Sequence, residues 1–232
     1  MPRRASRLSR RGIAGTGAKA TRAAPAGAIA AGAGASTGPA AAARISAMAS
    51  HADATGAAIE TIGGGRFLRL VRRGKWEFVE RTNASGATAI VALTDEGRLV
   101  LIEQPRPALG GVAIELPAGL VGDTPGDEGE EMARAAGREL TEETGFEARE
   151  IVQVASGPSS PGLTSETISI FVATGLTKVG PGGGVESEEI TVFEVPLGEV
   201  EAFLAEKIAR GAHVDLKVWA GLYFAHRALQ GR

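Results

Sequence analysis

The sequence predicts an α/β fold of the α+β kind, in which a few helices cover a mixed β-sheet. Runs of apolar and β-branched residues of strand length recur between residues 66 and 197. Helical periodicity is confined to one stretch in the middle of the chain and two at its end. Strands and helices do not alternate regularly and no internal repeat is present, so an all-parallel sheet or a repeat protein is not expected.

Residues 1–55 are expected to form a disordered tail that precedes a folded domain at 56–232. The stretch "AAPAGAIAAGAGASTGPAAAA" consists of small residues broken by Gly and Pro, so it can bury little apolar surface. It is also too broken to span a membrane. The first fifty residues hold eight basic and no acidic side chains, which resembles an organelle transit peptide. The alternatives are a plain tail or a true start near Met48.

Charge and composition exclude several classes of function. The net charge of −2 conceals an acidic body, because the residues after position 50 include 17 basic and 27 acidic ones. An acidic body argues against nucleic-acid binding. The absence of cysteine excludes disulfides and thiolate chemistry and fits a cytoplasmic protein. The three histidines are scattered, which argues against a Ser-His-Asp triad or a histidine-rich metal site.

The folded part is expected to begin with strands. The alternating runs "RFLRLVRRG" (66–74) and "WEFVER" (76–81) predict the first two. Residues 88–104 contain two β-rich runs joined at Asp95-Glu96-Gly97, which predicts a hairpin. The run "GVAIELPAGLV" (111–121) predicts one more strand, closed by Pro117 and Gly119.

A helix is expected to follow and to end near Thr144, because Gly145 suits the position after a helix where φ is positive. The later strands are expected at 149–155, 167–176 and 190–197, and the closing helices at 197–211 and 215–229. Trp219, Leu222 and Tyr223 in the last helix are expected to pack in the core.

The segment "RELTEETGF" (138–146) concentrates negative charge on the central helix. Glu139, Glu142 and Glu143 stand at i, i+3 and i+4, so they lie on nearly one face and repel one another. Hard oxygen ligands of this kind are the ones that Mg²⁺ prefers, and a bound cation offsets the repulsion.

Glu130, seven further residues and "RELTEETGF" together resemble the Nudix box. One position departs from the pattern, because Thr124 stands where a glycine is usual; Gly119, with about five inserted residues, is the better counterpart. The resemblance implies a Nudix fold, which is an α/β/α sandwich with a mixed sheet. It also implies a Mg²⁺ ion (or Mn²⁺) on Glu139 and Glu143, with Arg138 and Glu142 among the catalytic residues.

Three further stretches resemble the ADP-ribose/ADP-sugar pyrophosphatase branch of that family. "EQPRPALGGVAIELPAGLV" implies that Arg106 contacts phosphates and that the carbonyl of Ala118 binds metal. "GPSSPGLTSE" places Pro161 where this branch has a characteristic proline. "WEFVER" implies adenine stacking on Trp76, a base-edge contact from Glu77 and a phosphate or ribose contact from Arg81.

The catalytic base is expected in "GGGVESEEI", where two alignments favour either Glu186 or Glu188; in the first, Glu188 lies near metal. The glycines at 182–184 fit a mobile loop. The resemblance also implies a homodimer formed through an N-terminal β-element at 56–85, and Mg²⁺-dependent hydrolysis of ADP-ribose to AMP and ribose 5-phosphate. The alternatives are another nucleoside diphosphate sugar such as ADP-glucose or GDP-mannose, a dinucleotide, or a non-catalytic module that senses ADP-ribose.

Overall fold

The computed structural model describes residues 57–123, 130–185 and 188–230. The predicted tail at 1–55, the inserted loop residues 124–129 and the candidate base Glu186 lie outside the described residues. Among the helices that are described, none is both long and apolar enough to cross a lipid bilayer.

A small antiparallel sheet opens the described chain, as expected for the N-terminal β-element. It contains β1 (Ile59–Gly64), β2 (Leu68–Arg73) and β3 (Trp76–Arg81), in that order. Strand β1 was not among the predicted strands, because "IETIGG" is short and rich in glycine. At Val79, β3 also bonds to another segment: its N–H donates to the Leu163 carbonyl at 2.8 Å, and its carbonyl accepts from Ser165 N–H at 3.2 Å.

Two mixed four-stranded sheets form the body. One has the order β7 (Ala118–Val121), β4 (Gly86–Ala92), β9 (Thr167–Lys178), β8 (Phe146–Pro158). The other has the order β10 (Thr191–Pro196), β5 (Arg98–Arg106), β6 (Gly111–Glu115), β11 (His213–Val214). The pairs β4–β9 and β6–β11 are parallel and the rest antiparallel, which confirms the mixed character.

Two expectations about strands need correction. The turn at Asp95-Glu96-Gly97 is present, but after a single bridge between Leu93 and Leu99 its two strands enter different sheets instead of forming a hairpin. Both strands are almost wholly buried apolar runs, so each pairs on both edges within its own sheet. Residues 111–121 likewise form β6 and β7 in different sheets, with the break at Pro117, which has no N–H for a ladder.

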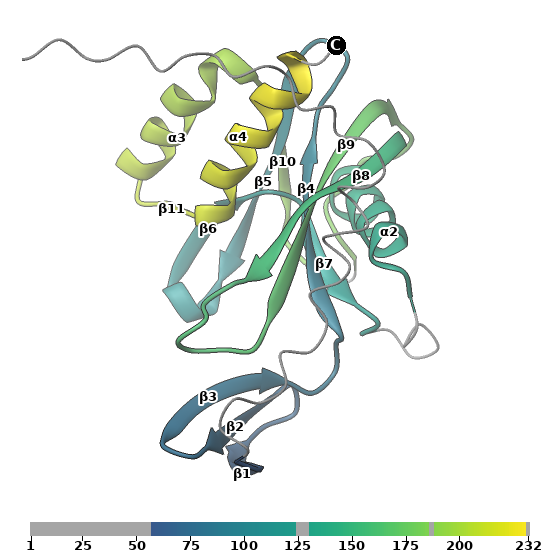
Figure 1. The fold of residues 1–232 in the computed structure, drawn as a ribbon. Coiled ribbons are helices and arrows are strands. Elements are labelled where there is room, and N and C mark those ends of the chain that lie inside the picture. Colours follow the sequence, from purple (N-terminus) through teal and green to yellow (C-terminus); the bar gives the residue numbers. More distant parts are fainter. Residues whose placement is uncertain (1–56, 124–129, 186–187, 231–232) are drawn as a thin grey trace, which may run out of the picture. The chain divides into compact units, whose positions relative to one another are not determined.

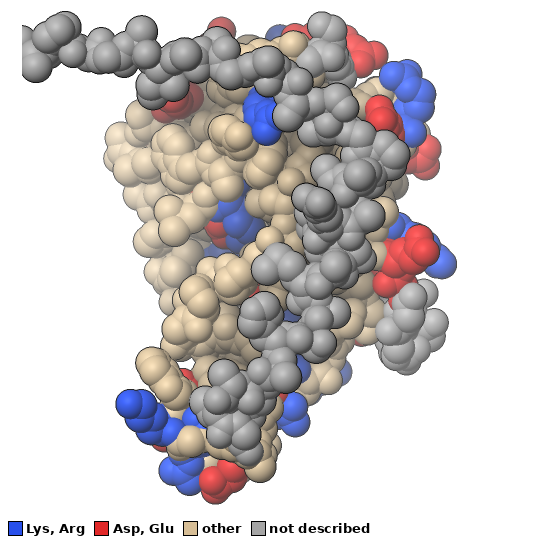
Figure 2. All heavy atoms as spheres, viewed as in Figure 1, with Lys and Arg blue, Asp and Glu red and all other residues tan. Residues whose placement is uncertain are grey.

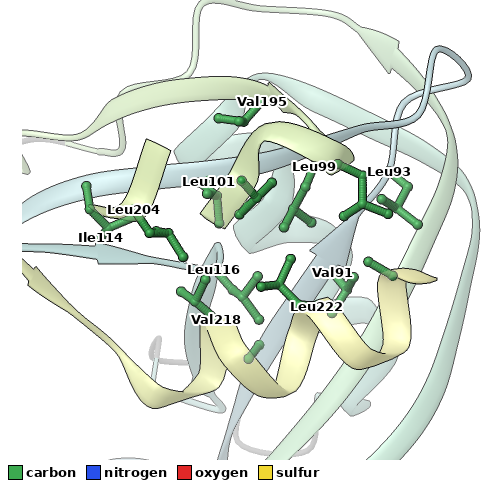
Figure 3. Close-up of a cluster of buried hydrophobic side chains, with 14 of the residues drawn as sticks. Val91, Leu93, Leu99, Leu101, Ile114, Leu116, Val195, Leu204, Val218 and Leu222 are labelled. Atoms are coloured by element: carbon green, nitrogen blue, oxygen red, sulfur yellow. The ribbon is translucent and has the colours of Figure 1, made fainter. Parts of the chain in front are cut away.

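Helices cover the sheets on two sides (Figure 1), which confirms the α/β/α arrangement. They are α2 (Met132–Thr144), α3 (Val200–Ala209) and α4 (Leu216–Gln230), with short 3₁₀ turns at Pro107–Leu109 and Leu197–Glu199. One apolar cluster joins α3 and α4 to the sheets, and Figure 3 shows Leu204, Val218 and Leu222 from these helices pointing at Leu99 and Leu116. A second cluster, with Ala136 and Leu140, packs α2 on the other side.

The prediction that Trp219, Leu222 and Tyr223 of α4 pack in the core is wrong for two of the three. Leu222 is buried, but Trp219 is 43% exposed and Tyr223 is 58% exposed. The buried face of α4 is instead made of smaller residues, including Val218, Gly221 and Ala225. A Cβ at Gly221 would come within 2.9 Å of Leu116, so the helix approaches the sheet too closely for large side chains.

Candidate active site

Helix α2 turns an apolar face to the core and an acidic face to a cleft. Ala136 and Leu140 are fully buried in the apolar cluster beneath the helix. Glu139 and Glu143, one turn apart, line a cavity of about 350 Å³. The helix ends as expected, since Gly145 has a φ of 70° and its N–H donates to the Thr141 carbonyl. The predicted acidic face is therefore fixed in register by the apolar residues behind it.

Arg138 lies among the carboxylates of the box. Its Nη1 is 2.9 Å from Glu139 and 3.0 Å from Glu142, and its Nη2 is 3.4 Å from Glu130. Its Nη2 also donates to the Leu120 carbonyl of β7 at 3.3 Å. The guanidinium thus ties the helix to the neighbouring strand and holds the carboxylates of Glu139 and Glu142 in place.

Strand β7 approaches α2 very closely at Ala118 and Gly119. Ala118 N–H donates to Glu143 at 2.9 Å. A Cβ built on Gly119 would lie 1.9 Å from the carboxylate carbon of Glu139, a distance that no real contact allows. Any side chain at this position would displace the Glu139 carboxylate, as expected if Gly119 is the counterpart of the first glycine of the box.

The two cleft carboxylates hold their protons unusually tightly. Burial raises the pKa of Glu143 to about 8; the Ala118 hydrogen bond acts in the opposite direction, and Glu139, Glu188 and Glu115 raise the pKa further. Burial also raises the pKa of Glu139 to about 7, although Arg138 acts in the opposite direction. Ionising either carboxylate is therefore costly in a site where water is largely excluded, and a bound cation would relieve that cost.

Basic side chains predicted to meet phosphates line the same cavity. Arg106 makes a two-pronged ion pair with Glu115, in which Nε donates at 2.7 Å and Nη2 at 2.6 Å. Arg81 donates from Nε to Glu166 at 2.5 Å. Both arginines are thereby oriented by carboxylates within the cleft, and neither lies on a remote surface.

A second pocket, of about 260 Å³, collects the residues predicted to bind adenine. It is lined by Trp76 and Glu77 of β3 and by Pro161 and Gly162 of the loop between β8 and β9. Trp76 is 62% exposed, so it is not a core residue of this chain. The two pockets lie along the same segments, because Ser165 lines this one and Glu166 lines the cleft.

Glu188 lies in the cleft on a loop that is bonded to the end of α2. Gly183 N–H donates to the Glu143 carbonyl at 2.8 Å, and Gly184 N–H to the Glu142 carbonyl at 3.1 Å. The Glu188 carboxylate accepts from Val185 N–H at 2.9 Å. The glycines have positive φ values, and a Cβ on Gly184 would come within 2.4 Å of Glu188, so this conformation of the loop needs glycine; the mobility of the loop stays a prediction.

The expected metal ligands line the same cleft, but their side chains do not converge on one point as the ligands of a bound ion would. Across the described part of the chain, no three acidic, histidine or cysteine side chains converge closely enough to hold an ion. Glu139 faces Arg138, Glu143 faces Ala118 N–H, and Glu188 faces Val185 N–H. Metal binding by these residues stays a prediction, and it requires at least one of these contacts to open.

Several cleft residues were not predicted as part of the site, and four of them bring side-chain amide or charged groups that matter below. Glu115 and Glu166 carried a signal, since each is an acidic residue next to an apolar strand within a stretch already singled out. Gln104 and Lys217 carried none, because a single amide or lysine has no pattern in sequence.

Known proteins resemble this chain in sequence. Residues 84–214 match the NUDIX domain family. The chain is 33% identical over 155 residues to a methanol dehydrogenase activator of Bacillus methanolicus, covering 64% of this chain and 81% of that protein. It is 34% identical over 113 residues to an ADP-ribose pyrophosphatase of Bacillus subtilis, covering 48% and 58%. It is 35% identical over 169 residues to a GDP-mannose pyrophosphatase of Cronobacter sakazakii, covering 69% and 81%.

A solved structure of an ADP compounds hydrolase supports the fold. It has a TM-score of 0.57 at 24% identity and covers 75% of this chain and 92% of its own. The family match spans more than half of the chain and contains the acidic helix, its glycine neighbour and the loop of Glu188. The chain therefore belongs to the Nudix hydrolase family.

Proposed function

We propose that this protein hydrolyses the pyrophosphate bond of ADP-ribose, or of a closely related nucleoside diphosphate sugar, in a Mg²⁺-dependent reaction in the cytoplasm. The products from ADP-ribose would be AMP and ribose 5-phosphate. One observation carries the proposal: Glu139 and Glu143 share a single cavity with Arg81, Arg106 and Glu188. That combination offers ligands for a cation, donors for phosphate oxygens and a carboxylate that can accept a proton.

The donor set fits Mg²⁺ or Mn²⁺. Carboxylate oxygens are hard ligands, and the raised pKa values of Glu139 and Glu143 mark carboxylates whose ionisation a bound cation would favour. The Ala118 carbonyl, and Glu188 in one of the two alignments, would complete the ligand set. When bound, the metal would polarise the pyrophosphate and lower the pKa of the attacking water.

The remaining roles belong to side chains of the chain itself. Glu188, or Glu186 in the other alignment, would take the proton from water as a general base. Arg106, held by Glu115, would donate to the phosphate oxygens as charge develops. Arg138 would hold Glu139 and Glu142 in position, which is an indirect role.

The second pocket supports an adenine nucleotide as the constant half of the substrate. The exposed indole of Trp76 offers a stacking face, and Glu77 and Pro161 border it. Arg81, fixed by Glu166, lines the cleft at the other end of β3 and would contact a phosphate or ribose. The likeness to an ADP-ribose pyrophosphatase supports the same assignment.

GDP-mannose is the alternative substrate favoured by a specific observation, namely the 35% identity to a GDP-mannose pyrophosphatase over most of both chains. ADP-glucose is a third member of the same chemical class. A non-catalytic ADP-ribose sensor is less well supported, because the box keeps Glu139, Glu142 and Glu143.

The test is a substrate panel with purified protein. ADP-ribose, ADP-glucose and GDP-mannose are incubated with and without Mg²⁺, and the nucleotide products are separated by chromatography. We expect Mg²⁺-dependent AMP and ribose 5-phosphate, with the highest kcat/KM for ADP-ribose. GMP released faster than AMP would move the assignment to GDP-mannose. Binding of ADP-ribose without turnover would support the sensor instead.

A further inference from the structure

Gln104 places an unpaired amide inside the cleft. It is 9% exposed and lines the cavity together with the Arg106–Glu115 pair. Along β5, Val100 packs in the cluster beneath α2, and residues an even number of positions away point to the same face. Gln104 and Arg106 therefore point toward the carboxylates of α2. Within the described residues, no hydrogen bond reaches the Gln104 side chain, and its amide atoms are not among the sealed polar atoms that lack a partner, so the amide is open to the cleft.

Lys217 brings a cation to the same end of the cleft. It lies in the first turn of α4, where its backbone N–H donates to Asp215 at 2.7 Å and its ammonium pairs with the same carboxylate. Asp215 N–H donates to the Ile114 carbonyl at 3.0 Å, which anchors Lys217 next to Glu115 on β6. Figure 2 shows charged atoms of both signs in a hollow of a mostly uncharged face, close to where α4 begins in Figure 1.

The composition of this end limits what it can bind. Of the described side chains that line the cleft, none is aromatic. A second nucleobase would need a stacking surface, and the exposed indole at Trp76 belongs to the other pocket. An amide, an ammonium and a carboxylate together match the donors and acceptors of a hydroxylated, non-aromatic group.

We propose that Gln104 and Lys217 form the subsite for the second half of the substrate, and that this half is a sugar rather than a nucleoside. The inference rests on the proposed pyrophosphatase activity. Gln104 would donate to and accept from sugar hydroxyls, and Lys217 would donate to a hydroxyl oxygen while Asp215 holds its ammonium in place. Both residues would thereby select the leaving sugar without taking part in proton transfer.

The test compares two substrates that differ only in this half. ADP-ribose and the methyl ester of ADP share the adenosine and the pyrophosphate, but the ester has no sugar hydroxyls beyond them. In Gln104→Leu and Lys217→Met we expect kcat/KM for ADP-ribose to fall about tenfold while kcat/KM for the ester stays within about twofold. Gln230→Leu, an exposed amide at the end of α4, is the matched control and should change neither.

Diadenosine diphosphate, with a nucleoside in place of the sugar, should be a poor substrate of the wild type. An equal loss on both substrates, or no loss on either, would overturn the subsite. If the wild type hydrolyses nothing, binding of ADP-ribose and of the ester by calorimetry decides the matter. If the protein binds ADP-ribose more tightly than the ester and Gln104→Leu removes that difference, the subsite is supported although the hydrolase proposal fails. Equal affinities of the wild type for ADP-ribose and the ester would reject the subsite.

Discussion

At the scale of single residues, the site concentrates carboxylates that the folded chain holds at a cost. Glu143 is 4% exposed and faces Glu139, Glu188 and Glu115, and its main partner is one backbone N–H from Ala118. The cationic side chain of Arg138 forms ion pairs with Glu139 and Glu142 and not with Glu143. A cation bound in the cleft would offset the cost of ionising these carboxylates.

This cost predicts how the stability of the metal-free protein depends on pH. The pKa of Glu143, about 8, and that of Glu139, about 7, lie above the 4.5 of an ordinary glutamate. A raised pKa means that the folded state binds the proton more tightly. The stability that the folded state gains by binding these protons is therefore fully present below about pH 4.5, and it is lost as the pH rises through about 8.

We expect Glu143→Gln, which cannot ionise, to raise Tm by a few degrees at about pH 8 in EDTA and to have little effect at about pH 5. Calorimetry of both proteins across this range measures the difference. Glu147→Gln, an exposed carboxylate just after the helix, is the control and should leave Tm unchanged at both pH values. A Glu143→Gln variant less stable than wild type at high pH would show that its carboxylate is compensated in the fold.

The residues that sequence identified and those it missed differ for a physical reason. Glu139 and Glu143 follow from helical spacing, and the placement of Arg106 and Trp76 in two pockets agrees with their expected positions. Glu115, Glu166, Gln104 and Lys217 come from four separate elements or loops, so only the tertiary fold brings them together. The exposure of Trp219 and Tyr223 was missed because helical periodicity does not reveal how close a helix lies to its sheet.

At the scale of elements, α2 is held from two sides by segments that approach it through glycine. Strand β7 touches it at Gly119, and the loop of Glu188 bonds to its last carbonyls through Gly183 and Gly184. The first contact confines the Glu139 carboxylate, and the second positions the loop that carries Glu188 relative to the helix. Pre-positioning of this kind matters, because a displacement of about 1 Å can cost about a hundredfold in rate.

The close approach at β7 makes Gly119→Ala informative. The new methyl group would overlap Glu139 by more than 1 Å at its ideal position, 1.9 Å from the carboxylate carbon, so the carboxylate must move. We expect kcat to fall about a hundredfold with only a modest change in Tm. Gly157→Ala on β8, where a Cβ meets nothing within 4 Å, should keep full activity. Full activity in Gly119→Ala, measured by the same assay, would show that the position of Glu139 is not critical.

Most helices and strands could be predicted from the sequence, but the strands with which each strand pairs could not. The strands of 88–104 and the helix ending at Gly145 follow from apolar runs and turn residues. The division of 88–104 and 111–121 between two sheets does not, because a buried strand reads the same whichever neighbour it pairs with. Strand β11 has only two residues and leaves no pattern to detect.

At the scale of the whole molecule, the N-terminal sheet leaves apolar side chains uncovered. Ile59, Phe67, Leu68 and Leu70 on and beside β1 and β2 are exposed in the single chain. Exposed apolar groups gathered on one element mark an interaction surface. We propose that this sheet pairs with a second copy, which is the homodimer expected from the resemblance.

Light scattering after size-exclusion chromatography should give twice the 23.6 kDa mass of one chain. Phe67→Glu combined with Leu70→Glu should shift the protein to one chain, because the charges would be buried in the contact. Ile208→Glu, an equally exposed apolar position on α3, should leave the mass unchanged. A wild type with the mass of one chain at micromolar concentration would contradict the proposal.

The most direct test of the account compares AMP release from ADP-ribose by wild type, Glu143→Gln and Glu147→Gln, with and without Mg²⁺. If the cleft of α2 is a metal-assisted hydrolytic site, wild type and Glu147→Gln release AMP at equal, Mg²⁺-dependent rates. Glu143→Gln should then be slower by about a hundredfold or more. A Glu143→Gln rate within about threefold of wild type, well short of that expected loss, would contradict the assignment of the site.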